Sequence, residues 1–79
     1  SSIAAQQATV ERLQAEVRNA EVENQRYETL YQQGAISASE RDSKQLTLQT
    51  ARRNLQQAQA ELTRLQSTRS PELDKARAT

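Results

Sequence analysis

The residue types that usually carry out chemistry are scarce in this sequence, and their spacing does not suit catalysis. The 79 residues include no His and no Cys, and a single glycine, Gly34, cannot form a phosphate-binding loop or a dinucleotide fingerprint. Glu16, Glu21 and Glu23 lie close together, but acidic residues on a solvated helix face are a poor metal site. We therefore expect no catalytic residue, no bound metal and no cofactor.

The basic residues do not form a nucleic-acid site either. Eleven Lys and Arg are balanced by ten Asp and Glu along the chain, which gives a net charge of +1. Arg52 and Arg53 are neighbours, but Gln and Glu are interspersed around them and the following segment has no aromatic residue. We expect a solvated face there, and no partner held by bulk charge, whether nucleic acid or an anionic membrane surface.

Residues suited to binding another protein gather around Gly34. Leu30 is an apolar residue beside the turn, where a contact with another chain explains it best. We expect an exposed surface beside Arg26 that includes Leu30, Tyr31, Ala35 and Ile36. For Leu30 and Ile36 the alternative is a purely local role, in which their side chains pack back on the turn.

The elements that position these residues are predicted to be two helices joined by a turn at residues 34–37. Gly34 can adopt the positive φ that ends a helix, and Ser37 with Glu40 forms the S-x-x-E capping box that begins the next one. The flanking segments 3–33 and 38–69 are rich in helix formers and contain no Gly or Pro. Ser70-Pro71 is expected to end the second helix, which leaves 71–79 as a tail.

Both predicted helices carry a seam of residues in alternating steps of three and four, which is typical of a coiled coil. The first seam comprises Ile3, Gln6, Val10, Leu13, Val17, Ala20, Asn24, Tyr27 and Tyr31. The second comprises Arg41, Lys44, Leu48, Ala51, Leu55, Ala58, Leu62 and Leu65.

The two seams match when the chain folds back at Gly34. Val10 then meets Ala58, Leu13 meets Leu55, Val17 meets Ala51 and Ala20 meets Leu48, so a small residue repeatedly faces a large one. Near the turn the layers become polar, and they pair Asn24 with Lys44, Tyr27 with Arg41 and Tyr31 with Ser37. The sequence therefore predicts an all-α fold, an antiparallel two-helix coiled-coil hairpin over residues 1–70. The alternative is one continuous helix that dimerises, with Gly34 in its interior.

Composition supports a thin structure of this kind. Apolar residues make up 34% of the chain, with no Trp, Phe or Met, which is too few large side chains for a compact core. We expect a hairpin of marginal stability. Because two nearby chain ends suit insertion into a host domain, we also expect the chain to be a piece of a longer protein. No apolar run is long enough to span a bilayer.

At the turn the sequence resembles a known family. Arg26, Leu30 four places on and Ser37 seven further match the Arg-x3-Leu-x6-Ser tip signature of the α-helical hairpin in bacterial periplasmic adaptor subunits, or membrane fusion proteins. With Gly34-Ala35-Ile36-Ser37 and the leucine and alanine ladder that follows, it looks like the hairpin of HlyD-like and MacA-like adaptors of ABC exporters. The Gly-Ala-Ile-Ser turn resembles most closely the adaptors of cyanobacterial heterocyst-glycolipid exporters.

The resemblance implies a connector in the periplasm, within a protein anchored to the inner membrane. Arg26, Leu30 and Ser37 would dock tip to tip on a TolC-like outer-membrane channel, and the rest of the full-length adaptor would contact an inner-membrane ABC-type transporter. Such hairpins act in homo-oligomeric rings, usually hexamers. The other hypothesis is a generic coiled-coil oligomerisation module of a structural protein, whose long faces form the interface. The two hypotheses differ in whether mutations at the tip or only in the seam abolish function.

Overall fold

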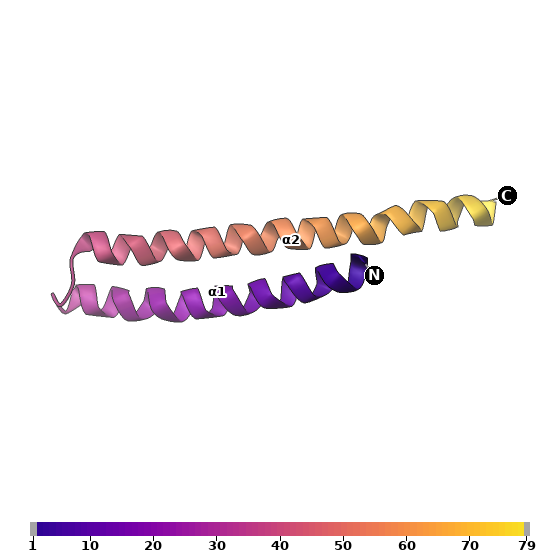
Figure 1. Cartoon of the computed structure of the whole chain (residues 1–79). Coiled ribbons are helices and arrows are strands. Elements are labelled where there is room, and N and C mark those ends of the chain that lie inside the picture. Colours follow the sequence, from indigo (N-terminus) through magenta and orange to yellow (C-terminus); the bar gives the residue numbers. More distant parts are fainter. Residues whose placement is uncertain (1, 79) are drawn as a thin grey trace.

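Two long helices lie side by side and antiparallel, as Figure 1 shows. The computed structural model describes the backbone of residues 2–78 and the side chains of residues 3–67. Helix α1 spans Ser2–Gln32 and helix α2 spans Ala38–Ala78. The described residues form no strand. The predicted all-α hairpin is thus confirmed, and the single continuous helix is excluded.

The seam residues form the core between the helices. Seven side chains are buried, each between 6% and 9% exposed: Val10, Leu13, Val17, Ala20, Leu48, Ala51 and Ala58. They form two apolar clusters, one around Ala20 and Leu48 and the other around Leu13 and Ala58, and Leu55 packs against both. The alternation of Ala with larger residues across the seam therefore sets the packing, as predicted.

One seam position near the termini is polar. Gln6 donates from its Nε2 to the backbone carbonyl of Ala58 at 3.0 Å. Leu62, one turn farther along α2, packs against the cluster that contains Leu13. An amide in a seam position is thus satisfied by a backbone acceptor of the partner helix, which avoids the cost of an unpaired polar group.

The predicted break at Ser70-Pro71 is wrong, because α2 continues to Ala78. A proline removes one intrahelical hydrogen bond, but residues 72–78 consist mainly of Glu, Leu, Lys, Ala and Arg, which favour helix strongly. The helix propensity of these residues therefore outweighs the helix-breaking effect of Pro71. Helix α2 therefore extends past the start of α1, at the end of the hairpin where both termini lie (Figure 1).

The result is a long, thin molecule with Cα extents of 68 × 17 × 13 Å. Among the described residues, neither helix is long and apolar enough to cross a membrane. The shape leaves a turn at one end, with residues 33–37 between the helices, and no other element of the described chain covers it.

Candidate functional site

The turn at the tip is fixed by backbone hydrogen bonds at the end of α1. The amide of Ala35 donates to the carbonyl of Leu30 at 2.9 Å, and the amide of Gly34 donates to the carbonyl of Tyr31 at 2.9 Å. This pair of bonds is the Schellman motif, which satisfies carbonyls that the helix end would otherwise leave unpaired. The tip is therefore a defined structure.

Gly34 and Ser37 have the roles that the sequence predicts. Gly34 has a φ of 77°, and a Cβ built on it would meet no atom within 4 Å, so backbone conformation alone selects glycine here. The amide of Glu40 donates to Ser37 Oγ at 3.1 Å, which caps α2. The Ser37 hydroxyl is thus already part of the fold before any partner binds.

The three candidate binding residues lie at the same end of the hairpin. Arg26 and Leu30 are one helical turn apart on α1, and Ser37 immediately precedes α2. The Arg26 side chain is 61% exposed, and its Nη1 lies 3.2 Å from Glu23 Oε1. A pair this exposed holds the guanidinium only weakly, so Arg26 is accessible to a partner.

The apolar surface at the tip is less open than predicted. Leu30, Tyr31 and Ile36 are half-buried, and only Ala35 is exposed. For Tyr31, part of the cover comes from the Arg41 guanidinium, which lies over its ring. Leu30 and Ile36 thus contribute partly to the tip's own packing and partly to its surface.

Two aromatic rings next to the tip are covered by cations from α2. The guanidinium carbon of Arg41 lies 4.2 Å from the centre of the Tyr31 ring, and Lys44 Nζ lies 4.7 Å from the centre of the Tyr27 ring. Both distances are within the range of cation–π attraction. The layers predicted as simply polar are therefore held by cation–π contacts.

The predicted partners in these layers are displaced by one turn. Arg41 lies on Tyr31 where Tyr27 was expected, and Lys44 lies on Tyr27 where Asn24 was expected. Helical side chains incline toward the N-terminus of their own helix, and for α2 that direction is toward the tip. Two tyrosines four residues apart on one helix, opposite two cations on the other, favour cation–π contacts. Pairing residues only by the level of their Cα atoms does not reveal these contacts.

Carboxylates complete this arrangement. Arg41 Nη1 lies 3.4 Å from Glu28 Oε2 across the two helices, and Arg41 Nε lies 2.8 Å from Asp42 Oδ1. The hydrogen bond to Asp42 raises the pKa of the Arg41 guanidinium, partial burial acts in the opposite sense, and Glu28 adds to the increase. Arg41 therefore remains a fixed positive charge beside Tyr31.

Asn24 is left without the partner that the pairing predicted. Its Oδ1 is buried and has no hydrogen-bond partner within the described part of the chain. Lys44 turns instead toward the Tyr27 ring and Glu23, whose Oε2 lies 3.6 Å from Lys44 Nζ. An unpaired acceptor destabilises this layer, which separates the apolar core from the tip.

Within the described residues, no group of three or more His, Cys, Asp or Glu is placed to hold a metal ion. Comparisons with protein-family models, with curated proteins and with solved structures gave no match. Function is therefore inferred from the chemistry and the position of the tip residues.

Proposed function

We propose that this chain is the hairpin of a bacterial periplasmic adaptor, which docks through its tip on a TolC-like outer-membrane channel. The observation that carries the proposal is the spacing of Arg26, Leu30 and Ser37 around the turn of an antiparallel hairpin. This pattern lies at the turn between the two helices, at the far end from both termini, where a partner can reach it (Figure 1).

Each of the three residues supplies a different contact in this proposal. Arg26 offers planar donors to backbone carbonyls of the channel, and its exposure allows it to exchange the Glu23 pair for them. Leu30 presents its exposed part to an apolar groove. Ser37 has one lone pair engaged by the Glu40 amide, so its hydroxyl proton can be donated to the channel.

The larger assembly follows from the same proposal. The full-length protein would be anchored to the inner membrane, would contact an ABC-type transporter there and would project this hairpin through the periplasm. Several copies in a ring, with six as the expected number, would present several tips to one channel. Avidity then compensates for the small area of each tip contact. The chain has no catalytic part in this scheme.

The proposal is tested in the full-length protein with Arg26→Asp and Leu30→Ser, measured by export and by pull-down of the channel. Both changes should abolish export and weaken the pull-down. Arg26→Asp should leave melting nearly unchanged, and Leu30→Ser should cost about 1 kcal/mol because Leu30 is only half-buried. The matched control for charge is Arg18→Asp, an exposed arginine of α1 two turns farther from the tip, which should export normally.

Gly34→Val serves as the variant in which fold and function fail together. It forces a β-branched side chain into positive φ and so should damage both the hairpin and export. Should Arg26→Asp and Leu30→Ser export and bind the channel at wild-type levels while core variants do not, the tip-docking proposal is wrong. The generic coiled-coil oligomerisation module would then take its place.

A further inference from the structure

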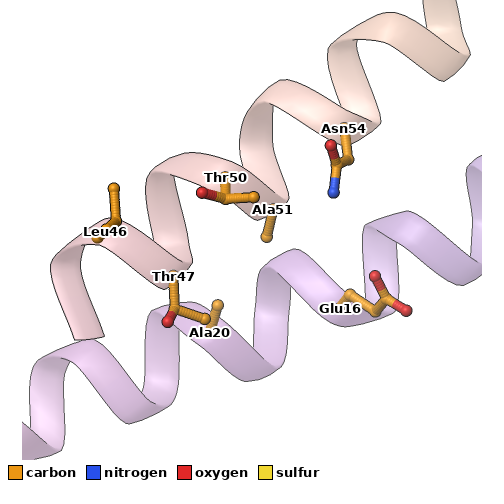
Figure 2. A pocket seen from close by; sticks show the side chains of 7 residues that line it. All are labelled: Glu16, Ala20, Leu46, Thr47, Thr50, Ala51 and Asn54. Atoms are coloured by element: carbon orange, nitrogen blue, oxygen red, sulfur yellow. The ribbon is translucent and has the colours of Figure 1, made fainter. Parts of the chain in front are cut away.

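The contacts that hold the two helices together change toward the tip. Figure 2 shows a shallow groove, where the small side chains of Ala20 and Ala51 lie between the helices. Both belong to an apolar cluster that includes the buried Leu48. Between residues 21 and 47, by contrast, no residue is buried. The tip half of the hairpin therefore depends on polar contacts for its shape.

Arg41 joins the first turn of α2 to the end of α1. Its guanidinium carbon lies 4.2 Å from the centre of the Tyr31 ring, and its Nη1 lies 3.4 Å from Glu28 Oε2. On its own helix, its Nε donates to Asp42 Oδ1 at 2.8 Å. Among the ion-paired side chains in the described part of the chain, that of Arg41 is the least exposed, at 23%. One planar group thus binds a ring and a carboxylate of α1, while a carboxylate of α2 fixes its direction.

The two α1 residues that Arg41 contacts are themselves connected to the turn. The carbonyl of Tyr31 accepts the amide of Gly34 at 2.9 Å, which is one of the two bonds of the Schellman motif. Glu28 uses its other oxygen, Oε1, to accept from Gln32 Nε2 at 3.3 Å. Because Gln32 is the last residue of α1, Arg41 contacts the part of the helix from which the turn starts.

On the α2 side, the backbone of Arg41 is bonded to Ser37. The amide of Arg41 donates to the Ser37 carbonyl at 3.2 Å, and the amide of Glu40 donates to Ser37 Oγ at 3.1 Å. The residue that binds the end of α1 through its side chain therefore also anchors Ser37 through its backbone. The position of Ser37 relative to Leu30, which lies next to Tyr31 on α1, depends on this one residue.

We propose that Arg41 is a positioning residue of the tip, whose planar guanidinium holds the first turn of α2 against the end of α1 and so keeps Leu30 and Ser37 in fixed relative places. A preorganised surface binds more tightly, because less conformational entropy is lost when the partner docks. The inference rests on the proposed function for the identity of the partner. The fixed geometry of the turn can be tested without any partner.

Lys44 provides a matched control, because it forms the same two kinds of contact one turn farther from the tip. Its Nζ lies 4.7 Å from the centre of the Tyr27 ring and 3.6 Å from Glu23 Oε2. Loss of either cation removes one cation–π contact and one ion pair between the helices, so Tm should fall by a similar amount. Only Arg41 contacts a residue whose carbonyl accepts an amide of the turn.

The first test compares Arg41→Gln with Lys44→Gln in the 79-residue chain by hydrogen exchange of the Gly34 and Ala35 amides, measured by NMR. These two amides form the Schellman motif, so their exchange reports opening of the turn. Arg41→Gln should speed their exchange about tenfold or more, and Lys44→Gln less than about threefold. Equal acceleration in the two variants, or no acceleration in Arg41→Gln, overturns the inference.

Arg41→Lys separates the positive charge from the planar shape of the guanidinium. An ammonium group can lie over the ring or pair with a carboxylate, but it lacks the flat set of donors that serves both carboxylates at once. Exchange of the Gly34 and Ala35 amides should therefore stay about threefold or more faster than in wild type. A return to wild-type exchange would mean that charge alone suffices, and it would overturn the role assigned to the guanidinium.

The second test measures docking by pull-down of the TolC-like channel with the full-length protein. Arg41→Gln should weaken the pull-down about tenfold, and Lys44→Gln should leave it near wild type. If Arg26→Asp weakens the pull-down but Arg41→Gln does not, the proposed function stands and the positioning role of Arg41 is wrong. If neither variant weakens it, the proposed function is wrong, and the exchange of the Gly34 and Ala35 amides decides whether Arg41 fixes the turn.

Discussion

The two halves of the hairpin are held together by different kinds of interaction. The apolar half, residues 10–20 and 48–58, packs Val, Leu and Ala side chains that are nearly all buried. The polar half, residues 23–31 and 37–44, uses cation–π contacts and ion pairs around Tyr27 and Tyr31. The apolar half depends on side-chain volume, which few substitutions preserve. The polar half depends on charged groups that remain near water, so residues beside it can serve another protein without loss of the fold.

The largest loss of stability is expected from a core truncation in the apolar half. Leu48 is 6% exposed and Leu46, two residues earlier, is 63% exposed. Leu48→Ala should cost about 2–5 kcal/mol of unfolding free energy because it leaves a cavity between the helices. Leu46→Ala should stay within about 0.5 kcal/mol when measured at a concentration where the chain is monomeric. Urea unfolding followed by circular dichroism gives both values, and equal losses would disprove the assignment of the core.

Removing the unpaired acceptor from the layer between the two halves should stabilise the hairpin. Asn24→Leu keeps a similar volume and eliminates the buried Oδ1 that has no partner. We expect a gain of about 1 kcal/mol and a Tm higher by about 4–8 °C. Gln25→Leu, at the exposed neighbouring position, is the control and should change Tm little. A lower Tm for Asn24→Leu would mean that the side-chain amide of Asn24 forms hydrogen bonds in solution.

A smaller effect is expected from the cation–π layers of the polar half. Arg41→Gln removes the contact with Tyr31 and the ion pair with Glu28. We expect Tm to fall by a few degrees. Arg12→Gln removes an exposed i,i+4 pair with Glu16 that involves no ring, and it should have no measurable effect. If both variants melt alike, the ring contact contributes nothing.

The smallest effect concerns pH, through the pair of Glu61 and Arg64 in α2. The hydrogen bond from Arg64 lowers the pKa of Glu61 below its ordinary value of 4.5. A lowered carboxyl pKa contributes stability that is fully present above the unfolded value and is lost as pH falls through the folded value. Melting at pH 6 and at pH 3 should therefore differ slightly less for Glu61→Gln than for wild type. An unchanged pH dependence would show that this exposed pair does not matter for stability.

The sequence predicted the fold because two independent signals agreed. The small-to-large alternation of Val17 with Ala51 and Ala20 with Leu48 requires an antiparallel register, and Gly34 with Ser37 places the turn at the centre of that register. The Arg41–Tyr31 and Lys44–Tyr27 contacts were missed because they depend on side-chain direction rather than on Cα level. The shallow groove lined by Ala20 and Ala51 could not be predicted, since it depends on how closely the helices approach there.

The most direct test of the central claim, that the tip binds while the seam holds the fold, is hydrogen–deuterium exchange of the chain with and without the periplasmic end of a TolC-like channel. A backbone amide exchanges its hydrogen when it opens to solvent. A docked partner therefore slows exchange only where it covers or rigidifies the chain. We predict added protection confined to residues 26–40, with no change in the apolar half. Protection along the long faces of α1 and α2 without any change at the tip would contradict the account.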